Sequence, residues 1–246
     1  NSYIGMPIIN GNKNIFNLTK EKCWLLGRYV ADGHYRKEKR KNRLNSFHYA
    51  VVYSIGKDKI DIFKECIKEH KFNYYKHSKS TYRAIFYSMD FVNFIINNNF
   101  GLGAENKRIP NFIFELPKEL AEEFLNGYMS GDGSVIRNEI FQAGTISREL
   151  ALDLCLLVLK CKNINTTISC HIPDKTKIIE GRMVNQSPYY TVRWRKCMNN
   201  RSKAFIENNV VWNPIKDKSE VFETELCELK LDRDCSYLAN NMIFKN

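Results

Sequence analysis

The chain lacks several features that would assign it to other classes of protein. No run of about eighteen apolar residues occurs, so the sequence predicts no membrane-spanning helix. The first residues contain no basic segment followed by an apolar one, as a secretory signal would. The eight cysteines form no Cys-x-x-Cys pair, which argues against a zinc site. Free thiols are therefore expected, in a reducing compartment inside the cell such as the cytoplasm, the nucleoid or the nucleus.

Acidic residues are the scarcer of the two charged classes. The chain has 27 Asp and Glu residues against 38 Lys and Arg, and its net charge at pH 7 is +11. This excess favours a polyanionic partner such as nucleic acid, although a generic basic protein would show the same balance. With 246 residues, of which 43% are hydrophobic, the chain can bury one large core or two small ones.

Two short segments nearly repeat each other. Residues 25–33, LLGRYVADG, are answered by residues 125–133, LNGYMSGDG, and each segment follows a helix-forming run. Each segment has two small residues four apart, which give the predicted helix a flat strip on one face: Gly27 and Ala31, then Gly127 and Gly131. The duplication predicts two similar halves about an approximate two-fold axis, with two helices in close contact.

The acids that end the two segments are placed unfavourably. Asp32 and Asp132 are expected at helix C-termini, and Gly33 and Gly133 at the left-handed position that follows. The helix macrodipole is negative there, and two converging carboxylates also repel each other. Bound divalent cations explain the choice, because they neutralise both acids. The alternative is a pair of ordinary capped helices in a duplicated core.

With these motifs the chain resembles the LAGLIDADG homing endonucleases, in particular those housed inside inteins. The resemblance implies that Asp32 and Asp132 are catalytic acids that bind metal, and that the carbonyls of Ala31 and Gly131 are supplementary ligands. It also implies hydrolysis of both DNA strands at a long asymmetric site, leaving short 3′ overhangs. Oxygen ligands favour Mg²⁺, for which Mn²⁺ is expected to substitute.

More of the chain shares this resemblance. Residues 106–110, NKRIP, are similar to the lysine block of intein endonucleases, which implies that Lys107 is catalytic. Residues 179–194 resemble the hairpin of the second half in the same proteins. The family carries a further basic residue in its second half, for which Lys196 is our candidate.

The C-terminus resembles the last two blocks of an intein. Residues 236–240, SYLAN, and residues 242–246, MIFKN, carry this resemblance, with Lys245 where inteins usually have His and Asn246 as the final Asn. No Thr-x-x-His block precedes the first motif. We therefore expect that this polypeptide does not splice alone, and that an N-terminal intein fragment is a candidate partner.

The expected fold class is α+β, a pseudo-two-fold pair of αββαββα halves. The resemblance implies that their antiparallel sheets form a saddle over duplex DNA and that the protein is a monomer. The expected parts are a linker, the first half, the second half and a splicing-block remnant, at residues 1–15, 16–115, 116–214 and 215–246.

Hydrophobic periodicity predicts the same order of elements in each half. For the first half it predicts a helix, a basic loop, a strand, a helix, a hairpin and a helix, at residues 20–31, 36–43, 47–55, 58–69, 73–87 and 89–96. For the second half it predicts a helix ending at residue 131, then a strand, a helix, two strands and a helix, at residues 139–143, 147–161, 165–172, 189–195 and 202–208.

The DNA-binding surface is expected on the basic loop and on the strands. Residues 36–43 follow Asp32 closely, and their basic side chains would neutralise phosphates. Polar residues alternate with apolar ones along residues 190–195, so one face of that strand is basic. The candidate contacts are Arg36, Lys37, Lys39, Arg40, Lys41, Arg43, His48, Lys76, Arg83, Thr191, Arg193 and Arg195.

Three functions remain open at the level of the sequence. The first is a site-specific, Mg²⁺-dependent double-strand DNA endonuclease. The second is a DNA- or RNA-binding protein that uses the same saddle without cutting. The third is a C-terminal fragment of a split intein that acts in protein splicing. Retention of Asp32, Asp132 and Lys107 favours the endonuclease over the second.

Overall fold

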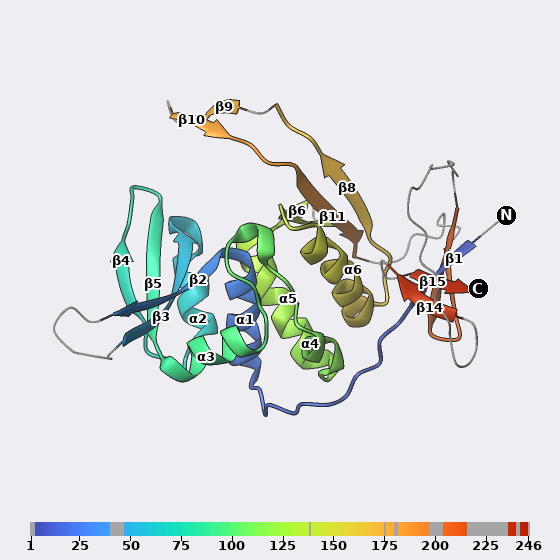
Figure 1. Cartoon of the computed structure of the whole chain (residues 1–246), viewed down its shortest axis with the longest axis horizontal. Helices are drawn as coiled ribbons and strands as arrows, with labels where there is room; N and C mark the ends of the chain where they lie inside the picture. The colour runs from blue at the N-terminus through green and yellow to red at the C-terminus, as the bar shows by residue number, and fades with distance from the viewer. Residues whose placement is uncertain are drawn as a thin grey trace.

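The computed structural model describes residues 3–39, 47–137, 139–174, 176–179, 182–196, 204–215, 236–239 and 242–245. Two α/β halves meet at a central pair of helices, and a third sheet lies at one end of the molecule (Figure 1). Helices and antiparallel sheets together confirm the α+β class. None of the helices in the described ranges is both long and apolar enough to cross a membrane.

The first half consists of one four-stranded sheet and the helices packed against it. Its elements are α1 (Lys20–Asp32), β2 (Gly33–Lys39), β3 (Phe47–Gly56), α2 (Ile60–Cys66), β4 (Asn73–Lys76), β5 (Thr81–Tyr87) and α3 (Met89–Asn97). All neighbouring strands are antiparallel, in the order β2-β3-β5-β4. Tyr53 Oη donates a hydrogen bond to Leu25 O at 3.3 Å, so the odd-numbered side chains of β3 face the helices. The even-numbered ones lie on the open face.

The second half repeats this plan. After the short helix α4 (Asn111–Glu115), its elements are α5 (Lys118–Asp132), β6 (Gly133–Ile136), β7 (Ile140–Thr145), α6 (Arg148–Lys162), β8 (Thr167–His171) and β11 (Tyr189–Arg195). The strand order is β6-β7-β11-β8. Strands β9 (Thr176–Ile179) and β10 (Arg182–Asn185) form a two-stranded arm that extends beyond this sheet (Figure 1).

Helices α1 and α5 pack together so closely that only glycine fits at the contact, as the repeat predicts. A Cβ added to Gly27 would lie 1.9 Å from Phe124 O, and one added to Gly127 would lie 2.0 Å from Trp24 O. Each glycine therefore lies against the backbone of the opposite helix. This reciprocal contact is what an internal two-fold axis requires.

The prediction that Gly33 and Gly133 adopt the left-handed conformation is wrong. Gly33 and Gly133 have φ values of −92° and −94°, and both begin strands. Glycine is needed there because the strand turns back over its own helix. A Cβ on Gly33 would lie 2.6 Å from Tyr29 Cα, and one on Gly133 would lie 2.6 Å from Met129 Cα.

Two element predictions in the first half are also wrong. The basic run is not a loop at residues 36–39, because these residues continue β2 and pair with β3. The helix predicted at residues 58–69 ends at Cys66. Its expected last turn is replaced by a different contact, in which the backbone N–H groups of Lys68 and Glu69 donate to the carboxylate of Glu21 at 3.0 Å and 2.9 Å.

The third sheet overturns the helix predicted at residues 202–208. Strand β12 (Phe205–Glu207) turns through Asn208 and Asn209, both with positive φ, into β13 (Val210–Pro214). A two-residue Asn-Asn turn of this hand matches the twist of a hairpin. The sheet has the order β12-β13-β1-β15-β14, with β1 (Tyr3–Pro7), β14 (Ser236–Ala239) and β15 (Met242–Lys245). Residues 3–7 are thus a strand rather than a linker, and residues 205–214 join this sheet rather than the second half.

Candidate active site

Asp32 and Asp132 are the last residues of the paired helices, on the two sides of the internal axis. Asp32 Oδ2 lies where a Cβ on Gly131 would be only 2.8 Å away, so this carboxylate reaches across to the end of α5. Burial, and then the charge of Asp32, raise the pKa of Asp132 to about 6. The two acids therefore influence each other at one site, where Asp32 is half-buried and Asp132 is open to solvent.

Three cationic side chains surround the two acids. Arg28, which is 2% exposed, donates from Nη2 to Asp32 Oδ2 at 2.9 Å and to Ser54 O at 2.8 Å. Lys59 Nζ donates to Gly131 O at 3.0 Å. Lys107 Nζ donates to Tyr29 O at 2.8 Å and to Gly33 O at 2.9 Å.

Lys107 is buried, with 4% of its surface exposed. Burial lowers its pKa to about 7, and the nearby Asp132 and Asp32 act in the opposite direction. The segment that carries it is held by the second half: Ser147 Oγ, at the start of α6, donates to Lys107 O at 3.0 Å. The lysine thus lies between the two halves, beside both motif helices.

The sequence reasoning missed Arg28 and Lys59. Arg28 could have been found, because it lies four residues before Asp32 on the same helix and so must be its neighbour. Lys59 carries no such local signal. It follows β3 and reaches Gly131 only because the two halves pack together.

Lys196, the candidate for the second basic residue, lies at the end of β11. Its backbone N–H donates to Glu139 O at 3.0 Å, and its side chain is exposed. It borders a cavity that Lys59 also lines. In the described structure the lysine at the end of the second motif helix is the half-buried Lys59 of the first half, which contacts Gly131 O.

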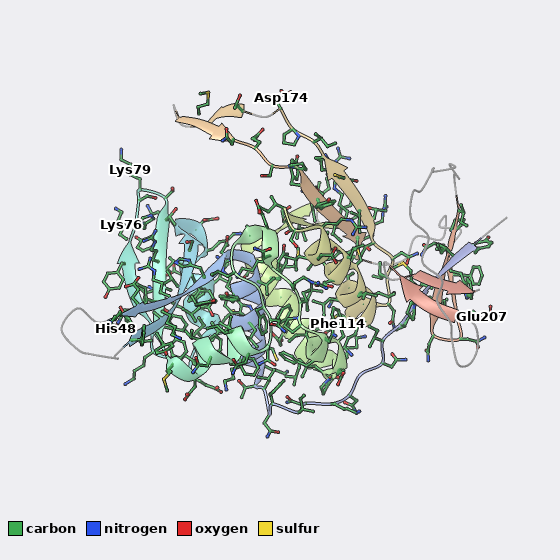
Figure 2. All side chains as sticks on the ribbon, in the orientation of Figure 1. His48, Lys76, Lys79, Phe114, Asp174 and Glu207 are labelled. Carbon is green, nitrogen blue, oxygen red and sulfur yellow. The ribbon has the colours of Figure 1, made fainter. Side chains whose placement is uncertain are left out.

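The open faces of the two sheets carry some of the candidate DNA contacts. Strand register places Arg36, His48 and Arg83 on the open face of the first sheet, together with His34. Burial, and then the nearby Arg36, Arg83 and Lys107, lower the pKa of His34. Figure 2 labels His48 on this sheet.

Other candidates of the first half lie elsewhere. Register places Lys37, Lys39 and Lys76 on the opposite face of the sheet, which is a correction. The cause is the two-residue period of a strand, which separates Lys37 from Arg36. Lys37 Nζ lies 5.4 Å from the ring centre of Phe47 instead. Three further candidates, Arg40, Lys41 and Arg43, fall outside the described residues.

The second sheet has a more polar open face. Thr191, Arg193 and Arg195 lie on it, as their alternation with apolar residues predicts. Thr191 is buried, with 3% exposure, whereas Arg193 is exposed and donates from Nε to Gln142 Oε1 at 2.7 Å. This bond engages Nε of the guanidinium and fixes Arg193 beside Gln142 on the neighbouring strand.

Comparison with curated proteins finds similar segments inside longer chains of different kinds. The chain is 36% identical over 135 residues to a DNA polymerase of Thermococcus kodakarensis, which covers 54% of the chain and 8% of that protein. It is 28% identical over 156 residues to the replication factor C small subunit of Methanocaldococcus jannaschii, with coverages of 57% and 8%. It is 22% identical over 242 residues to an iron–sulfur cluster assembly SufBD family protein of Mycobacterium bovis, with coverages of 93% and 27%. The chain thus spans less than a third of each of these relatives. No family model matches.

Among solved structures, the chain is similar to a homing endonuclease, I-DmoI, in complex with DNA and Ca, with a TM-score of 0.48 and 15% identity. The match covers 71% of this chain and 82% of that one. It is also similar to I-SmaMI bound to an uncleaved DNA target with calcium ions, with a TM-score of 0.42 and 12% identity, over 73% of this chain and 80% of that one.

Only one of the two residues expected in a splicing remnant falls within the described residues. Lys245 is the last residue of β15, in the third sheet. Asn246 lies outside the described residues. The candidate active site therefore consists of the two acids, their three cations and the open sheet faces.

Proposed function

We propose that the chain is a site-specific double-strand DNA endonuclease of the LAGLIDADG homing type, derived from an intein or part of one. The observation that carries this is the cluster at the internal axis, where Asp32 and Asp132 meet between Arg28, Lys59 and Lys107. Duplicated helices deliver one acid from each half. Duplex DNA has two equivalent strands, so an arrangement with one acid from each half suits it as a substrate.

The donor set fits Mg²⁺, with Mn²⁺ as a substitute. Burial, and then the charge of Asp32, raise the pKa of Asp132, and a divalent cation would relieve the repulsion between the two carboxylates. Asp32, Asp132 and the carbonyls of Ala31 and Gly131 would hold it, after Lys59 releases Gly131 O. Bound metal supplies a more acidic attacking water and neutralises charge on the leaving oxygen.

The side chains of this chain position the phosphate. Lys107, fixed by two carbonyls, presents its Nζ where negative charge develops on the scissile phosphate, and Lys59 does the same beside Gly131, at the end of the other motif helix. Arg28 orients the Asp32 carboxylate through their 2.9 Å ion pair. Lys196 is a further, more exposed donor at the rim.

The open sheet faces would hold the duplex. Side chains of the two sheets, in particular Arg36, Arg83, Arg193 and Arg195, would contact phosphates and bases. Lys76 and Lys37 would contribute only to the general positive field, because they lie on the other face.

The relatives support an inserted origin. A polymerase, a clamp-loader subunit and an iron–sulfur assembly protein share only this segment with the chain, over 8%, 8% and 27% of their lengths. A mobile element carried inside unrelated host proteins has this distribution. We assign the third sheet, which joins β1 to β14 and β15, to the remnant of a splicing domain.

The test is cleavage of the uninterrupted host gene. Incubation with Mg²⁺ should produce one double-strand break with short 3′ overhangs, at or near the insertion point. Asp132→Asn should abolish it, and Lys107→Met should slow it by about 10²-fold, the usual effect of losing one charge-stabilising donor. Binding of this DNA without any cleavage would instead establish a recognition protein.

The third sheet favours splicing as a second candidate function, because it pairs strand β1 with C-terminal strands. Mixing the chain with a cognate N-terminal intein fragment tests this directly. A ligated product on a denaturing gel would support it, and its absence would leave the nuclease as the chain's own activity.

A further inference from the structure

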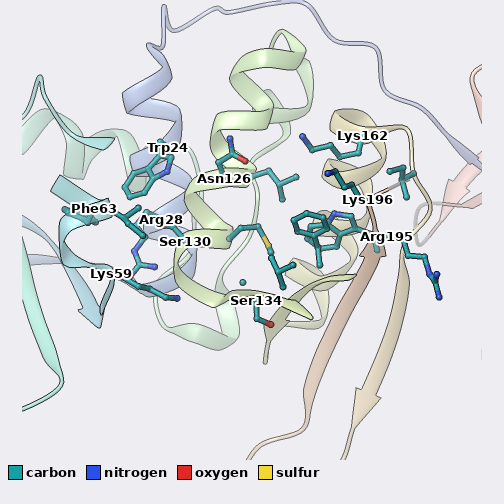
Figure 3. A pocket seen from close by; sticks show the side chains of 18 of the residues that line it. Trp24, Arg28, Lys59, Phe63, Asn126, Ser130, Ser134, Lys162, Arg195 and Lys196 are labelled. Carbon is teal, nitrogen blue, oxygen red and sulfur yellow. The ribbon is translucent and has the colours of Figure 1, made fainter. Parts of the chain in front are cut away.

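A cavity of about 640 Å³ lies between the two halves (Figure 3). The first half contributes Trp24 and Phe63 to its wall, and the second half contributes Leu125, Phe141 and Trp194. Phe141 and Trp194 stack with their ring centres 5.7 Å apart. The cavity is large enough for a drug-sized ligand and has an apolar lining suited to one.

The internal repeat explains why the cavity exists. In the first half, Tyr29 of the repeat is covered: its ring meets Phe100, its hydroxyl donates to Gly101 O at 3.1 Å, and its carbonyl accepts from Lys107. The corresponding residue of the second repeat, Met129, lines the cavity. The groove is thus built twice, and the described residues fill only the first copy.

The charge around the cavity has one sign. Its lining includes Arg28, Lys59, Lys162 and Lys196, and among the described lining residues there is no Asp or Glu. Arg195 also borders it, but strand alternation directs its side chain to the open face. The potential inside therefore favours an anion.

Arg28 provides a second, independent sign of a ligand. It is 2% exposed, yet Nε and Nη1 have no hydrogen-bond partner among the residues described. A buried, unpaired guanidinium nitrogen is costly, so an acceptor supplied from the cavity would be favourable.

We propose that this cavity is a binding site for an amphipathic organic anion. An aromatic or aliphatic body lies against Trp24, Phe63, Phe141 and Trp194, and a carboxylate, sulfonate or phosphate group faces Arg28 and the lysines. The cavity shares Arg28 and Lys59 with the proposed active site, but binding of an organic anion needs neither DNA nor metal, so it can be tested independently of the proposed nuclease function.

The probe is 8-anilinonaphthalene-1-sulfonate, an aromatic ring system with one sulfonate, titrated into the full chain and followed by fluorescence and calorimetry. We expect one saturable site. The uncharged parent, N-phenyl-1-naphthylamine, should bind at least about tenfold more weakly, because it cannot use the cations. No saturable binding, or equal binding of the two compounds, would overturn the proposal.

Variants locate the site. Val135→Trp and Ile62→Trp each place a large ring in the cavity from a half-exposed position, at 53% and 55% exposure, and each should weaken the probe by about tenfold or more. Lys162→Gln should weaken it roughly two- to fivefold, whereas Lys118→Gln, on an exposed lysine outside the lining, should not. Circular dichroism confirms that each variant is folded. Unchanged affinity in both tryptophan variants would place the probe elsewhere and refute this site.

Discussion

At the scale of the residue, the two acids carry opposite demands on stability and function. Desolvation at the packed helix end, and then the charge of Asp32, raise the pKa of Asp132, so its ionised form destabilises the fold although solvent reaches the carboxylate. Arg28, Lys59 and Lys107 offset this without removing it. Under the proposed function the same carboxylate pair would bind the divalent cation, which would remove this repulsion.

Removing one of these acids should separate the two effects. The pKa of Asp132 in the folded chain is about 6, above its ordinary value of 3.8, so folding holds the proton more tightly and the free energy of unfolding falls as the pH rises from about 4 to about 6. Without divalent metal at pH 8, Asp132→Asn should therefore raise the free energy of unfolding, by about 1 kcal/mol, because solvent screens the charge of this exposed carboxylate. Urea denaturation at pH 4 and pH 8 measures this.

The control for this prediction is the metal itself. Adding Mg²⁺ should raise the melting temperature of the native chain more than that of Asp132→Asn, because binding stabilises only the state that holds the ion. A variant less stable than the native chain at pH 8 without metal would contradict the account of Asp132 given above.

At the scale of the element, the contact between α1 and α5 sets the geometry of the site. Gly27 and Gly127 let the two backbones touch, and the acids one turn further on follow from that contact. A larger distance between the two helices would move both carboxylates. It would also break the bonds that Lys59 donates to Gly131 O and Lys107 donates to Tyr29 O.

Gly27→Ala should therefore be severe. Its Cβ would meet the backbone carbonyl of Phe124, which cannot swing aside, and we expect a loss of about 3 kcal/mol or more in the free energy of unfolding. Gly144→Ala is the matched control, because a Cβ there meets nothing within 4 Å, and it should cost less than about 0.5 kcal/mol. Similar losses from the two substitutions, compared by urea denaturation, would refute the close helix contact.

The two sheets differ in what their open faces offer to bases. Ile85 and Tyr87 make the first face partly apolar, whereas Gln142 and Arg193 make the second polar. Because Gln142 holds Nε of Arg193 at 2.7 Å, the terminal nitrogens suit the two acceptors of a guanine edge.

Selection from a randomised duplex pool tests this reading. The half-site under the second sheet should contain a guanine whose preference is lost in Arg193→Ala, at a cost of about 1–3 kcal/mol for that base, and reduced in Gln142→Ala. Arg148→Ala, on α6 away from the open face, should leave the preference intact. Enrichment of the same guanine by Arg193→Ala would show that another side chain reads it.

At the scale of the whole molecule, charge and internal symmetry act together. The net charge of +11 attracts any polyanion, and under the proposed function the two open faces would decide where a duplex lies. Affinity for duplex DNA should fall by about 10³-fold or more between 50 and 200 mM salt, as expected for about six or more phosphate contacts, and filter binding across this range checks it. A nearly flat dependence would exclude the saddle as the DNA-binding surface.

Much of the candidate site could be predicted from the sequence. The repeat of small residues and Asp-Gly predicted the helix pair and the position of both acids, because helical spacing is a local property. Alternation of polar and apolar residues predicted the strands β3, β5 and β11. The sequence also predicted the helix cap at Ser147, whose hydroxyl accepts from Leu150 N. The basic run was misassigned because charge hides the strand pattern that pairing with β3 imposes.

The duplication, the α+β class and the pair of acids could all be predicted from the residues, because each follows from spacing within short segments of the chain. Tertiary structure alone brought Lys59 and Lys107 to those acids and joined residues 3–7 to residues 210–214 in a third sheet. The physical reason is distance along the chain: Lys59 meets Gly131, and β1 meets β13, only after two halves have packed, and no local pattern records the partner.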